Sequence, residues 1–181
     1  MLFFRADDTE HDEVFMNTVA QKLYEVDNFQ PFVNECLGIL NGVPLLDQFK
    51  RQNIQKIIFQ PLLVCGGLAR IKEGGCELVM YLDTRAANYD EHAFTLGHEI
   101  GHTFHPLPDG ENLDSLRMHA QGLPAVHEEE DLIDRIVERN ESFADAFAEA
   151  WLKQDKNKDS AEMFISACHP GEEQVFFVLL K

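Results

Sequence analysis

The feature that most constrains this chain is a pair of histidines four residues apart, in the segment His98-Glu99-Ile100-Gly101-His102. In a helix, residues four apart stand one turn above each other on the same face, so both imidazoles can reach one metal ion. Glu99 is rotated by one residue, close enough to take a proton from a metal-activated water without ligating the metal. This arrangement is typical of zinc hydrolases. The spacing therefore predicts a metal site at His98 and His102, with Glu99 as the general base.

Two glycines lie in the same segment, which reads as an amphipathic helix from about Asp90 to Phe104. A glycine in a helix interior costs about 1 kcal/mol relative to alanine. Gly97 and Gly101 therefore need a reason, and the close approach of a second helix or of a substrate strand is one. The alternative to a metal site is a histidine pair that is merely solvated or hydrogen-bonded within the core.

A catalytic zinc ion takes a third protein ligand and leaves its fourth position to water. The metzincin solution, a histidine six residues after the second one, is excluded because Pro108 stands there. Among the other histidines, His105, His119 and His127 stay possible. An amphipathic helix predicted over residues 126–153 offers carboxylates instead. They form one row at spacings of three or four residues: Asp134, Glu138, Glu141, Asp145 and Glu149.

The best-placed carboxylate in this row is Glu141, in the segment Asn140-Glu141-Ser142-Phe143-Ala144-Asp145. Its NExxxD form is the gluzincin arrangement. There the glutamate ligates the metal, and the aspartate one turn later supports a zinc-bound histidine. Small residues beside Glu141, such as Ala144, allow its helix to come close. We therefore predict Glu141 as the third ligand, with Glu138 as the main alternative.

Helices and short strands are expected in the rest of the chain. Helical spacing and caps predict three helices ahead of the motif, over residues 9–28, 31–41 and 47–60. Two β-type runs, over residues 68–72 and 76–82, flank Glu73-Gly74-Gly75 and predict a hairpin. The second run is a candidate edge strand for pairing with an extended substrate.

Nothing in the sequence divides the chain into separate domains. Residues 106–125 read as a long loop, and the apolar tail over residues 175–180 fits either a helix or a strand. No linker rich in glycine, serine or proline is present. We therefore predict one α+β domain over residues 1–181, with a small twisted sheet.

Acidic residues outnumber basic ones, 32 against 15, which gives a net charge of −17. Ten of these net negative charges fall in residues 105–181. A surface this acidic repels phosphate backbones. We therefore expect no direct binding of nucleic acid, and a basic partner is favoured.

Location and redox state also follow from composition. No apolar run approaches the roughly 20 residues that a membrane span needs. The acidic pair Asp7-Asp8 follows the first residues at once, unlike a signal peptide. The four cysteines are spaced like neither a disulfide framework nor a zinc knuckle: Cys36, Cys65, Cys76 and Cys168. We expect a cytoplasmic protein with reduced, mostly buried cysteines and no membrane association.

Residues 94–105, FTLGHEIGHTFH, resemble the FTLAHELGHLLLH core of the ImmA/IrrE group of zinc metallopeptidases. Residues 141–148 resemble that family's later ExxANxFA helix, with Asp145 in place of the commoner asparagine. The run Val79-Met80-Tyr81-Leu82 resembles the strand before its active helix. Together the resemblance covers roughly residues 65–152.

This resemblance implies a zincin-like fold in which His98, His102 and Glu141 bind one zinc ion per chain, with Glu99 as the general base. It also implies a metallopeptidase that cuts regulatory, repressor-like proteins at specific sites. Because the C-terminal half is acidic, we expect a basic protein or peptide substrate. The alternative is a zinc-containing regulatory or binding module that sequesters a basic protein with little or no proteolysis. The sequence leaves the oligomeric state open.

Overall fold

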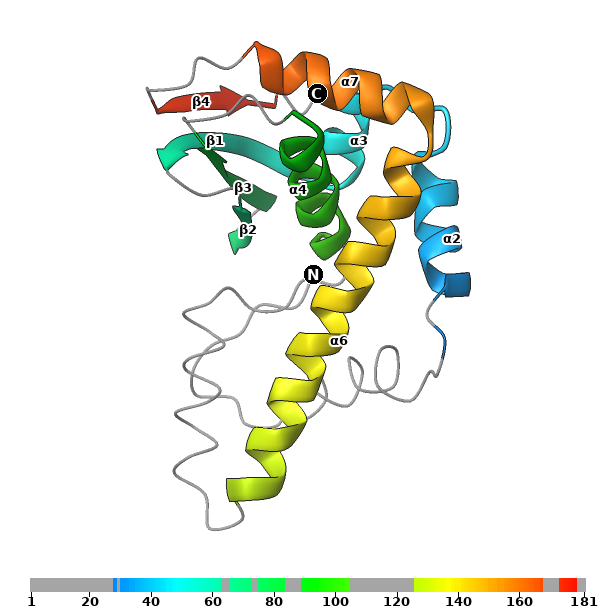
Figure 1. Ribbon diagram of the computed structural model, residues 1–181, viewed down its shortest axis with the longest axis vertical. Coiled ribbons are helices and arrows are strands. Elements are labelled where there is room, and N and C mark those ends of the chain that lie inside the picture. Colours follow the sequence, from blue (N-terminus) through cyan, green and yellow to red (C-terminus); the bar gives the residue numbers. More distant parts are fainter. Residues whose placement is uncertain are drawn as a thin grey trace.

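The structure is a computed structural model that describes residues 28, 30–62, 66–72, 75–83, 89–104, 126–167 and 173–178. In this part of the chain, five helices accompany a four-stranded mixed sheet (Figure 1). The predicted combination of helices with a small sheet is confirmed at that level. The helix expected over residues 9–28 and the loop expected over residues 106–125 lie outside the described residues. So do His105, His119 and the side chain of His127.

The elements were predicted in part. The helices are α2 (Gln30–Leu40), α3 (Leu45–Arg51), α4 (Tyr89–His102), α6 (Val126–Leu152) and α7 (Asp155–Ser166). The strands are β1 (Ile54–Leu62), β2 (Gly66–Lys72), β3 (Gly75–Asp83) and β4 (Gln174–Phe177). Helices α2, α4 and α6 and strands β2 and β3 lie close to their predicted bounds. None of the described helices is both long and apolar enough to cross a membrane.

The helix predicted over residues 47–60 is wrong beyond Arg51, because β1 begins at Ile54. Asn53 adopts a left-handed backbone with φ 54°, a conformation that does not continue a right-handed helix. The following residues include the β-branched Ile57 and Ile58, which favour a strand. Ile54, Ile57 and Ile58 lie at helical spacing, but over so short a stretch this spacing does not separate a buried strand from a helix.

The sheet has the strand order β2-β3-β1-β4. Strand β3 runs parallel to β1 and antiparallel to β2, while β4 runs antiparallel to β1. The prediction that residues 76–82 form an edge strand is therefore wrong, since β3 is paired on both sides. Strand β2 is the edge strand on the side of the sheet nearest the motif helix, and it contacts α4.

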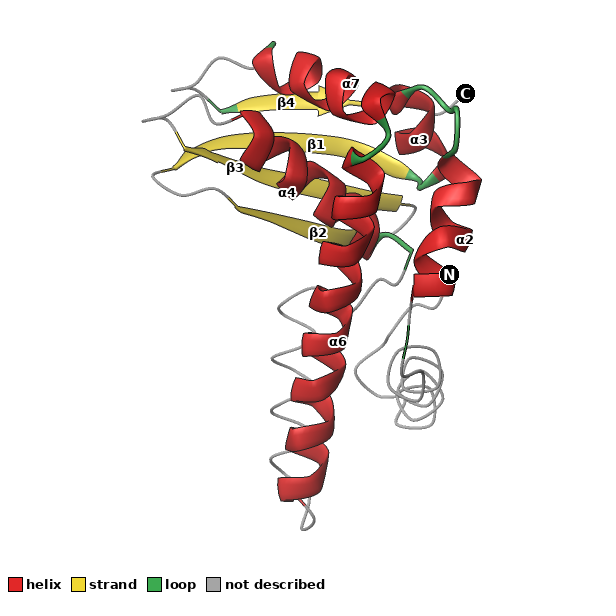
Figure 2. Cartoon of the chain, turned by 45° about the vertical axis from the view of Figure 1, so that its right-hand side comes forward, coloured by secondary structure: helices red, strands yellow, loops and turns green. Residues whose placement is uncertain are grey.

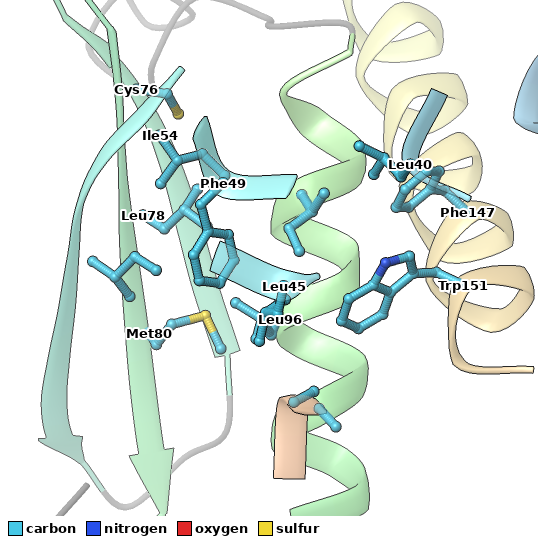
Figure 3. Close-up of a cluster of buried hydrophobic side chains, with 14 of the residues drawn as sticks. Leu40, Leu45, Phe49, Ile54, Cys76, Leu78, Met80, Leu96, Phe147 and Trp151 are labelled. Atoms are coloured by element: carbon cyan, nitrogen blue, oxygen red, sulfur yellow. The ribbon is translucent and has the colours of Figure 1, made fainter. Parts of the chain in front are cut away.

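Helix α4 lies between the sheet and α6, while α6 continues well beyond the sheet (Figures 1 and 2). The core fills the space on both sides of α4. Leu78 and Met80 face it from β3, and Leu96 from α4 packs in the same layer (Figure 3). Trp151 reaches α4 from α6, and all four side chains are fully buried.

Helix α7 was not predicted, and the C-terminal tail proves to be a strand. Phe164 of α7 packs against Phe59 of β1 and Phe176 of β4, with ring centroids 5.4 to 5.6 Å apart. Such aromatic pairs add about 0.5–1.5 kcal/mol each beyond their buried area. This aromatic cluster attaches α7 to the sheet.

The two glycines of α4 permit a close contact with α6. A Cβ at Gly101 would lie 3.1 Å from the Cα of Ala144, and one at Gly97 would lie 2.9 Å from Cε3 of Trp151. Side chains at these positions would force the helices apart. The predicted close approach of a second helix is therefore confirmed.

A group of neutral side chains, which we call the amide cluster, joins α3, α6 and α7: Gln48, Trp151 and Asn157. The Trp151 indole donates to Oε1 of Gln48 at 2.8 Å, and the Gln48 amide donates to Oδ1 of Asn157 at 2.8 Å. Gln48 also donates to the carbonyl of Val43, and Asn157 to that of Trp151. Every side-chain polar atom of this buried cluster therefore has a partner.

Of the four cysteines, Cys36 and Cys76 lie in the described residues, and both are buried with their thiols outside any disulfide. Burial raises the pKa of the Cys76 thiol to about 12. A thiol with such a pKa carries almost no thiolate at neutral pH and is unreactive. The expectation of buried, reduced cysteines is confirmed for these two.

Candidate metal centre

Three side chains converge where α4 meets α6, and we call them the donor cluster: His98, His102 and Glu141. The two histidine Nε2 atoms are 2.9 Å apart. Glu141 places Oε2 3.2 Å from Nε2 of His98 and Oε1 3.4 Å from Nε2 of His102. Within the described part of the chain, this group could hold a metal ion.

The separations fit the size of a small divalent metal ion. Zn–N and Zn–O bonds of about 2.0–2.2 Å in tetrahedral geometry place neighbouring ligand atoms about 3.3–3.5 Å apart. The observed distances of 2.9, 3.2 and 3.4 Å need only a slight opening to match. The Glu141 side chain is 52% exposed, so one side of the cluster is open to water. A catalytic metal site needs such an open side.

Asp145 fixes the orientation of His98, because its Oδ1 lies 2.8 Å from Nδ1 of the imidazole. An ionised carboxylate only accepts hydrogen bonds, so Nδ1 of His98 carries the hydrogen. In the neutral ring, Nε2 then presents a lone pair to the donor cluster. The predicted contact between Asp145 and a motif histidine is present.

Asn140 lies against the other histidine, and the sequence analysis gave it no role. Its Nδ2 is 3.2 Å from Nδ1 of His102. Its Oδ1 is buried without a hydrogen-bond partner among the described residues. Turning the amide over brings Oδ1 to the Nδ1–H of His102, since the two amide ends have nearly the same shape. This satisfies the buried oxygen and aims the lone pair of His102 Nε2 at the cluster. The only sequence signal was its place one residue before Glu141.

The electrostatics of the cluster favour positive charge at its centre. Burial lowers the pKa of His98, but the hydrogen bond to Glu141, the charge of Glu99 and the hydrogen bond to Asp145 outweigh it and raise that pKa above its ordinary value. Hydrogen bonds from His102 and His98 hold the pKa of Glu141 well below its usual range. Either a shared proton or a metal cation supplies the charge that these donors require.

Glu99 is buried beside the donor cluster, with 3% of its surface exposed. Burial raises its pKa to about 7, an effect that the charges of His102 and His98 partly offset. One of its oxygens, Oε2, is buried without a partner among the described residues. A carboxyl group with a pKa near neutrality can both accept and return a proton, as a general base must.

The structure thus brings His98, His102 and Glu141 together and places Glu99 beside them. Glu138, the main alternative ligand, is exposed and lies outside the donor cluster. In comparisons with known proteins, no family model matches the chain, and neither a curated protein nor a solved structure matches it. The chemistry of this site therefore rests on its own residues.

Proposed function

We propose that this protein is a zinc-dependent peptidase with a zincin-like fold. In this proposal His98, His102 and Glu141 bind one zinc ion, and Glu99 is the general base. The observation that carries it is the convergence of three ligand atoms, 2.9 to 3.4 Å apart, beside a buried carboxylate. The sequence resemblance to the ImmA/IrrE metallopeptidases supports the same assignment.

The donor set favours a catalytic zinc ion over a structural one. Two imidazoles and one carboxylate are a common catalytic zinc set, with a fourth position for water. Structural zinc sites are usually closed by four protein ligands and are rich in cysteine. Here Cys36 and Cys76 do not belong to the donor cluster.

When bound, zinc supplies a Lewis acid that polarises the scissile carbonyl and acidifies a water molecule. Glu99 accepts the proton of the attacking water and returns it to the leaving amine. Asp145 and Asn140 hold the two imidazoles in the orientation that directs Nε2 inward.

The substrate that fits this surface is a basic protein or peptide in extended form. Strand β2 pairs only with β3 among the described strands, and it contacts α4. An extended peptide could add to such an edge through main-chain hydrogen bonds. The net charge of −17 favours capture of a basic chain. As the resemblance implies, we propose a repressor-like regulator as the natural substrate, and we propose a cytoplasmic location from the composition.

The alternative is a zinc-containing module that sequesters a basic partner without cutting it. Such a module has no use for a proton acceptor beside the metal. The buried, partnerless oxygen of Glu99 favours the peptidase, because burying a carboxylate oxygen without a partner is unfavourable unless the site uses it.

The variant Glu99→Gln separates the two functions. We expect the wild-type protein to bind one zinc ion per chain and to cut a synthetic peptide library rich in lysine and arginine, read by mass spectrometry. Glu99→Gln should bind zinc equally well and lose cleavage by about 100-fold or more. The control Glu91→Gln, an exposed position on the same helix, should behave as wild type. A wild-type protein that takes up no zinc, or an active Glu99→Gln variant, would contradict the proposal.

A further inference from the structure

Gly67 of strand β2 lies directly against the side chain of Glu99. A Cβ at Gly67 would lie 2.5 Å from Oε1 of Glu99, 2.6 Å from its Cγ and 2.8 Å from its Cδ. Real Cβ atoms essentially never approach other atoms so closely. The Glu99 side chain therefore occupies the space that any residue other than glycine at position 67 would fill.

The same strand also binds the carboxylate, through a backbone hydrogen bond from Ala69. The other oxygen, Oε2, has no partner among the described residues. The backbone of β2 thus binds the Glu99 carboxylate on one side, while Oε2 has no hydrogen-bond partner among the described residues. Since Glu99 is almost fully buried, it has little room to adopt another position.

Gly67 is required here because it has no side chain, and not because its backbone adopts a conformation that only glycine favours. Among the described glycines, Gly42 has a positive φ, and Gly67 does not. The neighbouring Gly66 is different in surroundings: a Cβ there would meet only Cδ2 of Tyr81, at an ordinary 3.8 Å. The two adjacent glycines of β2 therefore form a matched pair, one beneath Glu99 and one away from it.

We propose that Gly67 is a positioning residue for the general base: its bare Cα, together with the Ala69 amide, determines where the Glu99 carboxylate lies relative to the donor cluster. This inference rests on the proposed function for its catalytic consequence. The contact itself, between position 67 and Glu99, is independent of that function.

The catalytic consequence is tested with Gly67→Ala and its control Gly66→Ala. The three atoms nearest to the new methyl group all belong to Glu99, and none of them to a metal ligand. With a basic peptide selected from the library, we expect kcat of Gly67→Ala to fall about 100-fold, because an ångström of misplacement can cost that much. The KM and the zinc affinity should stay within about twofold, and Gly66→Ala should match wild type in all three.

Shortening the acid should restore part of the lost activity. Aspartate is one methylene shorter than glutamate, so Gly67→Ala/Glu99→Asp regains the space that the methyl group takes. We expect this double variant to be more active than Gly67→Ala alone. The proposal is overturned if Gly67→Ala keeps its kcat, if its zinc affinity falls as far as its kcat, or if Glu99→Asp brings no recovery.

A double-mutant cycle of thermal unfolding on the metal-free protein measures the contact between position 67 and Glu99 without an activity assay. Gly67→Ala should lower Tm by about 5 °C, because Glu99 must leave its buried position and the Ala69 amide. In a Glu99→Ala background the same substitution should cost almost nothing, since the atoms it would meet are gone. An equal loss in both backgrounds, or no loss in either, overturns the proposal. If the wild-type protein cuts no peptide, the proposed function fails, and this cycle still decides whether Gly67 positions Glu99.

Discussion

Two polar groups of this protein, the amide cluster and the donor cluster, differ in how completely they and the polar side chains beside them are hydrogen-bonded. In the amide cluster, Gln48, Trp151 and Asn157 pair with each other and with nearby carbonyls. Beside the donor cluster, Oε2 of Glu99 is buried without a partner among the described residues, and Oδ1 of Asn140 gains one only when its amide is turned over toward His102. Both groups tie helices together, but only the second is incomplete.

We interpret this difference as the difference between a structural polar cluster and a candidate ligand site. Leaving a buried polar atom unpaired costs about 1–3 kcal/mol, so folded proteins rarely keep such atoms without a use. The amide cluster is neutral and closed. The donor cluster is charged, half open to solvent at Glu141, and favours a cation at its centre. We therefore expect substitutions in the amide cluster to lower stability and substitutions in the donor cluster to lower metal affinity.

The largest effect is expected from the metal ligands themselves. His98→Ala, His102→Ala and Glu141→Ala should each weaken zinc binding by well over 100-fold, more than the loss of a partner behind a ligand. Isothermal titration calorimetry with Zn²⁺ measures this loss. Glu138→Ala, three residues before Glu141 and exposed, is the control and should bind as wild type. An essential Glu138 would show that the assignment of the third ligand is wrong.

The second effect is on stability and belongs to the amide cluster. Asn157→Ala leaves the buried Gln48 amide short of an acceptor, which should cost about 1–3 kcal/mol in the free energy of unfolding. Urea denaturation followed by circular dichroism measures it, and Lys156→Ala, an exposed neighbour on α7, should change it little. Zinc affinity should be unchanged in both. If Asn157→Ala instead lost zinc while keeping its stability, the two clusters would not be separate in function.

The third effect is again on zinc affinity, and it is smaller than the loss of a ligand. Asp145→Ala removes the acceptor that orients His98, so zinc affinity should fall by about 10–100-fold. Competition with a fluorescent zinc chelator resolves a change of this size. Glu149→Ala, one turn further along the same exposed face of α6, serves as the matched variant and should have no effect. Equal losses in both would mean that general negative charge, and not the Asp145 hydrogen bond, supports the histidine.

The smallest effect concerns salt. Replacing the exposed Glu138 and Glu149 by lysine should lower kcat/KM for a basic peptide several-fold at low salt, because steering acts through net charge. At about 0.1 M salt, charges more than roughly 10 Å apart are largely screened, so the difference should shrink as sodium chloride is added. The stability loss of Asn157→Ala should not depend on salt, since that cluster is uncharged. A salt-independent effect of the lysine substitutions would exclude steering.

The donor cluster could be anticipated from sequence because helix geometry carries most of it. Two histidines four residues apart must share a face, and Glu141 and Asp145 repeat the same spacing on a second helix. The sequence spacing could not predict which residues contact the ligands and the general base. The contacts of Asn140 with His102 and of Gly67 with Glu99 depend on how separate elements pack.

The fold was predicted unevenly for a related reason. Helix α6 has an amphipathic period over many turns and lies at its expected bounds, whereas residues 54–62 show helical spacing only over one turn and form a strand. Their strand conformation depends on pairing with β3 and β4, which are distant in sequence. The first half of helix α7 is polar, DKNKDS, and its contact with the sheet depends on Phe164, whose partners in the sheet belong to β1 and β4.

Gly97 and Gly101 stand one residue before His98 and His102, so the sequence repeats a glycine–histidine pair every four residues. On helix α4 the two glycines thus form a row without side chains beside the row of the two histidines. The glycine row packs against the backbone of α6. The distance from the histidines to Glu141 is then determined by the contact between the two helix backbones. Apolar residues elsewhere in the core could be exchanged in the course of evolution without changing that distance. To keep this site, the chain therefore needs the glycine–histidine repeat of α4 together with Glu141 and the small Ala144 of α6.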